Sequence, residues 1–306
     1  MPPPLLDPKN DFVFKRLFAG SPELLADLIN AVRTDAPPIE VVEVLNPRID
    51  PDELTGKFII LDVLARDEAG RLYNIEMHVR RHAGWNARST YYLARTLSNQ
   101  LNNGDDYREL KPVIGIHLVD FDLFDAADQA LWCFELRDRT QPHIVLTGEL
   151  QLNVIELRKA DRLLPQHAGT LAAWVAWFEH WHEESIMSAI THRPVQQAME
   201  QLKGLSADDE MRRLAFVRER ALHDEVSFTN AAREEGRAQG REEGREEGLE
   251  KGREEGQLRL LERQLQKKFG PLPDDIRTRL TKATAAHLSV WAENILFANT
   301  LDEVFH

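Results

Sequence analysis

The stretch at residues 57–79, KFIILDVLARDEAGRLYNIEMHV, predicts two antiparallel strands joined by a tight turn. The first strand is expected over residues 58–65, where Asp62 is the one polar side chain. The second is expected over residues 72–79, where polar and apolar residues alternate in period two. Gly70 falls in the turn between them, where a positive φ is often required. The stretch therefore predicts a hairpin with a carboxylate inside its apolar strand.

Burying the Asp62 carboxylate costs several kcal/mol unless a cation or hydrogen bonds compensate it. Glu76 and His78 share a face of the second strand, because side chains alternate along a strand. A register that pairs Asp62 with Glu76 requires a loop with an odd number of residues, such as residues 68–70. In that register two carboxylates and an imidazole converge on one face. The opposite face is expected to be the more buried one and carries Tyr73, Ile75, Met77 and Val79.

Two carboxylates on neighbouring strands suit a hard divalent cation such as Mg²⁺. Such an ion would polarise a phosphodiester and activate a water, and His78 would orient that water or stabilise developing charge. Without the ion, repulsion between Asp62 and Glu76 should raise the pKa of at least one of them. The alternative from the residues alone is a half-buried hairpin in which Asp62 hydrogen-bonds the backbone.

This pattern resembles the PD-(D/E)XK nuclease superfamily, with Asp62 as the first acid and Glu76-Met77-His78 in the place of the (D/E)XK triplet. More narrowly, about the first 230 residues resemble the recombination-promoting nuclease/putative transposase family. The matching pieces are NDFVFK at 10–15, LDV at 61–63, NIEM at 74–77, the Tyr pair at 91–92 and the segment 104–116. At the third triplet position the superfamily usually has Lys, and the family commonly Gln, where this chain has His78.

The resemblance implies a metal-dependent DNA endonuclease associated with recombination or mobile elements. It implies that Asp62 and Glu76 bind Mg²⁺ or Mn²⁺ and that Asp62, Glu76 and His78 are catalytic. Asp11, in the first helix, is a further candidate acid. Because His78 departs from the usual triplet, a catalytically weak or inactive nuclease-fold scaffold that binds DNA or oligomerises stays open as the alternative. A regulatory interaction protein is a third hypothesis.

The implied fold is α/β, with a restriction-endonuclease-like α-β-β-β-α-β core, helical extensions and a small C-terminal helical domain. The core elements are expected as a helical region at 9–33 broken at 20–22, strands at 39–45, 58–65 and 72–79, a helix at 85–103 and a strand at 112–118. Beyond the core, strands are expected at 130–137 and 145–157, and helices at 171–181 and 193–225. Ser21 is expected to cap the second part of the first helical region, and Cys133 to be a core thiol.

The chain of 306 residues carries a formal net charge of −13, which argues against indiscriminate binding to nucleic acid. Basic residues nevertheless gather between residues 71 and 95, around the predicted site. The residues expected to contact a DNA backbone are Lys15, Arg80, Arg88 and Arg95. The alternative is that they are ordinary solvated side chains.

Other features bear on location. The N-terminus shows no secretory signal pattern, no apolar run approaches the roughly 20 residues of a membrane helix, and the single cysteine suits a reducing compartment. These features favour a cytoplasmic protein without a membrane segment.

Glycine recurs every four residues in the segment 231–256, which otherwise consists mostly of Glu and Arg. The segment predicts either an exposed linker helix or a close helix pairing between subunits of a homo-oligomer. Residues 257–306 predict a small helical unit, similar to a C-terminal domain of unknown function found behind such nuclease-like domains. The expected division is therefore a nuclease-like domain at 1–230, a linker helix at 231–256 and a helical domain at 257–306.

Overall fold

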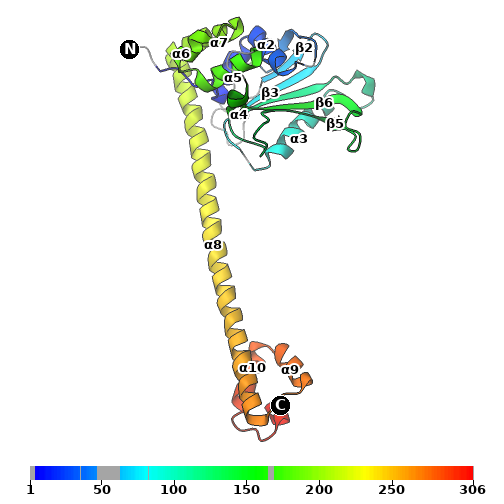
Figure 1. Cartoon of the computed structure of the whole chain (residues 1–306), viewed down its shortest axis with the longest axis vertical. Coiled ribbons are helices and arrows are strands. Elements are labelled where there is room, and N and C mark those ends of the chain that lie inside the picture. Colours follow the sequence, from blue (N-terminus) through cyan, green and yellow to red (C-terminus); the bar gives the residue numbers. More distant parts are fainter. Residues whose placement is uncertain (1–3, 35, 47–62, 82, 165–168, 306) are drawn as a thin grey trace. The chain divides into compact units, whose positions relative to one another are not determined.

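In the computed structural model, residues 4–34, 36–46, 63–81, 83–164 and 169–305 are described, and within them a six-stranded sheet forms the centre of the first unit (Figure 1). The chain divides into two units, Met1–Glu225 and Val226–His306. The strands are β1 (Val41–Val44), β2 (Val63–Asp67), β3 (Leu72–His78), β4 (Val113–Val119), β5 (Leu131–Arg137) and β6 (Val145–Glu156). Their order in the sheet is β1-β2-β3-β4-β6-β5. The pairs β3–β4 and β4–β6 are parallel, and the other pairs are antiparallel.

Helices cover both faces of this sheet (Figure 1). The helices are α1 (Asp11–Ala19), α2 (Pro22–Val32), α3 (Trp85–Ser98), α4 (Leu157–Leu163), α5 (Thr170–His180), α6 (Glu184–Ala189) and α7 (Arg193–Ala207). Helices α1, α2, α5 and α7 share one core with the Tyr73, Ile75 and Met77 face of β3. Helix α3 covers the other face, where Leu93 packs with Leu72 and Val113. The order of helices, three strands, helix and strand is the predicted α-β-β-β-α-β core, so the predicted fold class is confirmed.

The β2–β3 hairpin has the predicted odd loop. Val63 lies opposite Ile75, and the Asp67 amide donates to the Arg71 carbonyl at 3.1 Å, which leaves residues 68–70 as the loop. Gly70 closes the loop with a φ of 82°. The predicted loop and the register that follows from it are confirmed for the described residues. Asp62, for which the register was predicted, lies outside them, as do residues 58–61 of the first predicted strand.

Both faces of β3 are buried. Tyr73 and Ile75 on one face are 0% exposed and Met77 is 6% exposed, whereas Asn74 and Glu76 on the other are 3% and 2% exposed. The Tyr73 face is thus the more buried one by only a small margin. The margin is small because β3 lies in the middle of the sheet, where α3 covers the face that period-two alternation marks as polar.

Three local details also differ from the sequence predictions. Ser21 occupies the N-cap position of α2, but its hydroxyl donates to Gln201 at 2.9 Å and caps no backbone amide. Helix α3 ends at Ser98, before the predicted residue 103. Cys133 is exposed, because β5 is an edge strand of the sheet. The predicted strands at 130–137 and 145–157 are confirmed as β5 and β6.

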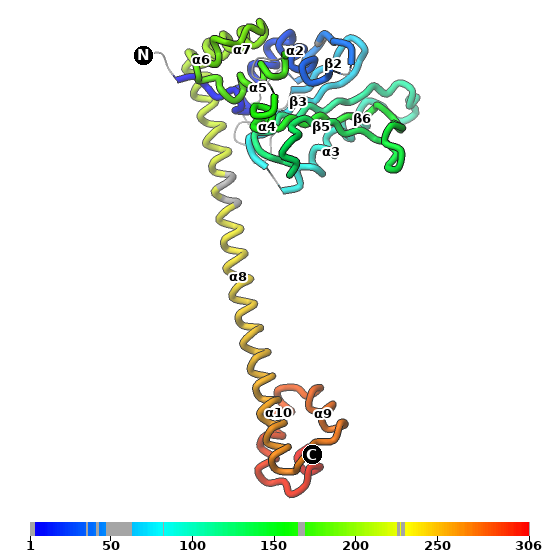
Figure 2. Tube along the Cα trace, viewed as in Figure 1, coloured from blue at the N-terminus to red at the C-terminus, as the bar shows by residue number. Residues whose placement is uncertain are grey.

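The second unit is built on the end of a long helix. Helix α8 spans Asp209–Phe269 and is followed by α9 (Asp274–Thr281), α10 (Ala285–Asn294) and α11 (Leu301–Val304), as Figure 2 shows along the chain. Leu261 and Leu265 of α8 belong to the same small core as Trp291 and Phe305. Among the described residues no helix is both long and apolar enough to cross a membrane.

The glycine-rich segment lies within α8, and every residue of 231–256 is exposed. A Cβ added at any of its glycines would meet no atom within 4 Å in this chain; these are Gly236, Gly240, Gly244, Gly248, Gly252 and Gly256. The segment is therefore a helix without packing partners within the described residues. The three-part domain division at 230 and 256 stays a prediction.

Candidate metal centre

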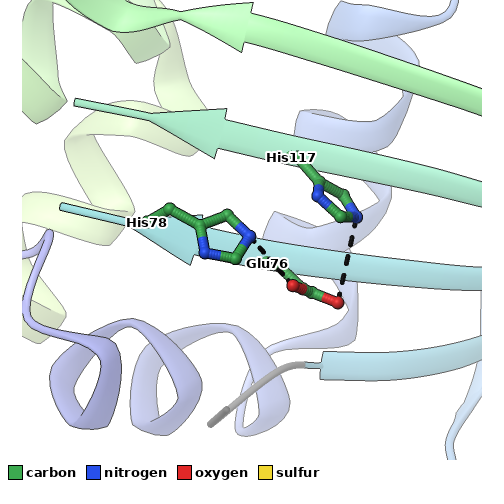
Figure 3. A group of neighbouring side chains, drawn as sticks. All are labelled: Glu76, His78 and His117. Atoms are coloured by element: carbon green, nitrogen blue, oxygen red, sulfur yellow. Dashed lines mark ion pairs between the residues drawn. The ribbon is translucent and has the colours of Figure 1, made fainter. Parts of the chain in front are cut away.

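Glu76 and His78 lie near the end of β3, and Figure 3 shows their side chains beside each other. The two residues are two positions apart, so the strand places them on one face. The His78 Nε2 atom lies 2.9 Å from Glu76 Oε2, which is ion-pair distance. The sequence prediction that these two side chains lie together is thus matched by their geometry.

His117 completes a cluster that the sequence prediction did not include. It lies on β4, which runs parallel to β3 with Glu76 directly opposite His117. The His117 Nε2 atom is 3.8 Å from Glu76 Oε1 (Figure 3). One potential ligand atom from each of Glu76, His78 and His117 lies within 4.8 Å of the others.

A signal for His117 was present in the sequence. It is a single ionisable residue inside the apolar strand VIGIHLV, all of which is buried. That is the signal that singled out Asp62. What the sequence lacked was the register between β3 and β4, because these strands are separated by α3.

Side chains from β3 and α3 surround the cluster. The Asn74 amide donates to Glu76 Oε1 at 2.7 Å. The Ser89 hydroxyl lies 3.4 Å from His117 Nδ1. The Trp85 ring meets both imidazoles edge to face, at centroid distances of 5.7 Å to His78 and 5.4 Å to His117. Trp85 and Ser89 are four residues apart, so one face of α3 covers the centre.

Several polar atoms of the centre are buried and have no hydrogen-bond partner among the described residues. These atoms are the Nε2 atoms of His78 and His117, the Asn74 Oδ1 atom and the Trp85 Nε1 atom. His78 Nε2 is close to Glu76 but lacks the direction of a hydrogen bond. An unpaired polar group in a protein interior costs free energy. Most buried polar groups therefore have a partner, which is another protein group, a water or an ion. The two imidazole nitrogens and the Glu76 carboxylate are groups that can bind a cation, whereas the Trp85 indole N–H can only donate a hydrogen bond.

The electrostatics of the centre set the charge of each group. Burial alone would raise the pKa of Glu76, but the facing imidazoles of His117 and His78 and the Asn74 amide outweigh it and lower the pKa to about 2. Burial lowers the pKa of His117 to about 4, against the pull of the Glu76 carboxylate. Near neutral pH the centre thus presents a carboxylate and a neutral imidazole, the forms that bind metal ions.

The expectation that repulsion between Asp62 and Glu76 raises the pKa of at least one of them stays a prediction. The pKa of Glu76 itself is lowered. The reason is that the described neighbours of Glu76 are imidazoles and an amide, which favour its ionised form. The other acid, Asp62, lies outside the described residues.

The residues predicted to contact DNA have different surroundings. Arg95 is exposed on α3. Arg88, on the same helix, is half-buried and lies over the Tyr92 ring at 5.7 Å. The Arg80 guanidinium donates to the Leu222 carbonyl of α8 at 2.7 Å. Lys15 is 3% exposed and lies on α1, on the other side of the sheet from α3, so its burial argues against contact with DNA.

Asp11, the further candidate acid, is held by an arginine. The Arg218 guanidinium of α8 contacts both oxygens of the Asp11 carboxylate, at 2.6 Å from Nη2 and 3.0 Å from Nε. Arg218 itself is 4% exposed. Asp11 therefore fixes the start of α8 to α1 and is not among the ligand atoms of the cluster.

Comparison with known proteins agrees with this fold. A family model described as PD-(D/E)XK nuclease family transposase matches residues 8–232. No curated protein and no solved structure matches the chain. The matched segment contains the whole sheet, α3 and the cluster of Glu76, His78 and His117. Because this match covers well over half of the 306 residues, the chain belongs to the PD-(D/E)XK nuclease family transposases.

Proposed function

We propose that this protein is a metal-dependent DNA endonuclease that hydrolyses phosphodiester bonds in recombination or in the movement of mobile elements. The observation that carries the proposal is the Glu76 carboxylate, held ionised at the triplet position between two imidazoles. Membership of a nuclease family linked to transposases supports the same reaction class.

Asp62 and Glu76 are the proposed ligands of a catalytic Mg²⁺ or Mn²⁺ ion. The pairing of Val63 with Ile75 supports this assignment, because it is the register on which the prediction for Asp62 depends. When bound, such an ion supplies Lewis-acid polarisation of the phosphodiester and activation of a water.

The protein's own side chains provide charge and orientation. Glu76 stays a carboxylate because of its imidazole and amide neighbours. His78, at 2.9 Å from Glu76, is placed to orient the attacking water or to stabilise developing charge. Trp85 and α3 close the face above both groups and limit the entry of bulk water.

DNA is the proposed partner, and its backbone is bound by arginines near the centre. Arg95 is the best placed of them, because it is exposed on the helix that covers Glu76 and His78. Arg88 and Arg80 are proposed to support it from α3 and from the end of β3. Phosphate contacts of this kind give affinity without sequence specificity.

Two further features are part of the proposal. The unpartnered glycines of α8 leave room for a second helix to approach closely, which would make the protein a homo-oligomer. A single cysteine and the DNA-directed reaction suit the cytoplasm.

The test is a plasmid-nicking assay with the full-length protein after removal of bound metal. We expect nicking of supercoiled DNA when a divalent ion is restored. Glu76→Gln keeps the shape but removes the charge, and should lower the rate by roughly 100-fold or more. Glu109→Gln, at an exposed glutamate of the same unit, is the matched control and should keep full activity.

Two results would contradict the proposal. One is equal nicking by the wild type and Glu76→Gln, which would point to a contaminating nuclease. The other is a folded, DNA-binding wild type that fails to nick DNA whichever divalent ion is supplied, which would favour the alternative of an inactive scaffold.

A further inference from the structure

The described donor set of the centre differs from the set that Mg²⁺ prefers. Mg²⁺ takes oxygen ligands and keeps several waters, whereas imidazole nitrogens suit Zn²⁺ and related transition ions. The cluster offers one carboxylate and two imidazoles. The proposed mechanism gives His117 no role, although it is completely buried beside the key carboxylate.

We propose that Glu76, His78 and His117 together bind one divalent transition-metal ion of the Zn²⁺ type, with His117 as a ligand. The inference rests on the proposed function, because the site shares Glu76 with the proposed nuclease centre, and it replaces the Mg²⁺ or Mn²⁺ ion of that proposal with an ion of the Zn²⁺ type. It adds a residue from β4 and a nitrogen-rich coordination to that centre.

The spacing of the donor atoms fits such an ion. With metal–ligand bonds of about 2.0–2.2 Å, the donor atoms of a tetrahedral zinc site lie roughly 3.3–3.6 Å apart. Here the separation is 2.9 Å between His78 Nε2 and Glu76 Oε2, and 3.8 Å between His117 Nε2 and Glu76 Oε1. The two separations lead to different oxygens of the Glu76 carboxylate and lie on either side of the tetrahedral value. With one ligand atom from each residue within 4.8 Å of the others, a bound ion would draw the three donors closer together.

The surroundings of the His117 nitrogen favour a bound ion. Its Nε2 atom is buried, has no hydrogen-bond partner among the described residues and lies 3.8 Å from Glu76 Oε1, beyond hydrogen-bond distance. If this nitrogen carries a hydrogen, the donor is unsatisfied; if it carries a lone pair, that lone pair faces a carboxylate. A cation bound by both groups removes the cost in either case.

Neighbouring side chains favour the tautomer that a ligand requires. Ser89 Oγ lies 3.4 Å from His117 Nδ1 and can accept a hydrogen from it, which leaves the lone pair on Nε2. The Asn74 amide donates to Glu76 Oε1, which orients the carboxylate. Hydrogen bonds to the ligand side chains, such as these, commonly tune metal affinity by about 10- to 100-fold.

The experiment measures metal binding by the full-length, metal-free protein, without using nuclease activity. Zn²⁺ is titrated in competition with a chromophoric chelator, Co²⁺ by its visible absorption, and Mg²⁺ by calorimetry. We expect one Zn²⁺ per chain and X-ray absorption that shows imidazole ligands. His117→Leu should weaken Zn²⁺ binding by roughly 100-fold or more, because one of three protein donors is lost.

The controls separate this site from adventitious binding. His143→Ala removes an exposed histidine of the same unit and should leave Zn²⁺ affinity unchanged. His78→Gln restores the usual residue of the family at the triplet and should also weaken Zn²⁺ binding. Thermal unfolding without metal shows whether each variant is folded. If either His117→Leu or His78→Gln does not fold, the other ligand variant still tests the site.

Zn²⁺ binds most nitrogen and oxygen sites more tightly than Mg²⁺ does. The inference is therefore tested by the difference in Zn²⁺ affinity between the wild type and its variants. Zn²⁺ affinity that is unchanged in folded His117→Leu would overturn the inference. A second outcome is that the wild type binds no Zn²⁺ and that wild type and His117→Leu nick DNA equally well with Mg²⁺. That outcome would retain the nuclease and reject this site. Zn²⁺ binding through His117 in a protein that never nicks would retain this site and reject the nuclease.

Discussion

The Glu76 carboxylate is 2% exposed and lies in the middle of a sheet, where its neighbours stabilise its charge. An isolated buried charge would neutralise itself by a shift in pKa. The His78 and His117 imidazoles and the Asn74 amide hold the carboxylate ionised instead. At the scale of single residues, the centre is thus a small network in which a buried acid and buried bases compensate each other.

His180, far from this centre in the sequence, offers a pH-dependent prediction. It lies between two carboxylates, with Nε2 at 3.0 Å from Asp161 and Nδ1 at 2.8 Å from Glu183. Burial lowers the pKa of His180, but the two carboxylates raise it more, so the net shift is upward. Its contribution to stability is therefore complete below the unfolded pKa of about 6.5 and is lost as pH rises through the higher folded value.

We expect His180→Gln to lower the unfolding free energy by about 1 kcal/mol or less at pH 6, and by a smaller amount at pH 9. Urea unfolding at both pH values measures the difference. His182→Gln is the control, since its side chain is 60% exposed and its closest approach to Glu183 is 4.0 Å. A gap between wild type and His180→Gln that widens toward pH 9 would contradict the prediction.

Helix α3 and strand β4 pack closely at one glycine, and this contact sets the height of α3 above the centre. A Cβ on Gly115 would lie 2.9 Å from Leu152 Cδ1 and 3.0 Å from Leu93 Cδ2. Leu93 belongs to α3, the same helix that places Ser89 against His117. At the scale of elements, the absence of a side chain at residue 115 lets the helix lie directly on the sheet.

Gly115→Ala should cost about 1–2 kcal/mol of unfolding free energy, because the added methyl group overpacks this contact. The two leucine ends can rotate partly away, which keeps the cost moderate. Gly148→Ala is the matched control, since an added Cβ at Gly148 meets no atom within 4 Å. Equal stability of the two variants by urea denaturation would refute the packing argument.

Arg95, exposed on α3, carries a prediction about DNA binding. Arg95→Gln should weaken binding to every DNA sequence alike and reduce the slope of log K against log salt by about 1. Fluorescence anisotropy over a range of salt concentrations measures this slope. Arg139→Gln, at an exposed arginine between β5 and β6, is the control and should leave the slope unchanged.

At the scale of the whole molecule, α8 runs from the first unit into the second, and its residues 231–256 have no packing partner among the described residues. Six exposed glycines each cost roughly 1 kcal/mol relative to alanine in a helix, and no burial offsets them in this chain. Exposed Glu–Arg pairs such as Glu242–Arg245 stabilise the helix by only a few tenths of a kcal/mol each. The segment is therefore the least stable part of α8.

Limited proteolysis should cut first between residues 231 and 256 and release fragments that keep their own cores. Replacing the six glycines with alanine should slow this cleavage by strengthening the helix. Mass spectrometry of the first fragments locates the cut. Full protection of the segment in the wild type would instead support a helix pair between two copies of the chain.

The sequence alone determined the features that depend on neighbouring residues. Period-two alternation and Gly70 were enough for the β2–β3 loop and its register, because a hairpin is closed by local geometry. Glu76 and His78 had to share a face because they are two residues apart on one strand. Helical spacing and breaks likewise predicted the order of elements in the α-β-β-β-α-β core.

Only the tertiary structure decided which residues meet across that core. His117 faces Glu76 because β4 returns beside β3 in parallel after α3, and that register depends on how α3 packs on the sheet. The same packing buries the polar face of β3 and gives Glu76 imidazole neighbours, which lower its pKa. Lys15 was buried by the layer of helices on the other face. Contacts between distant segments are set by the packing of whole elements, and periodicity within one element carries no information about them.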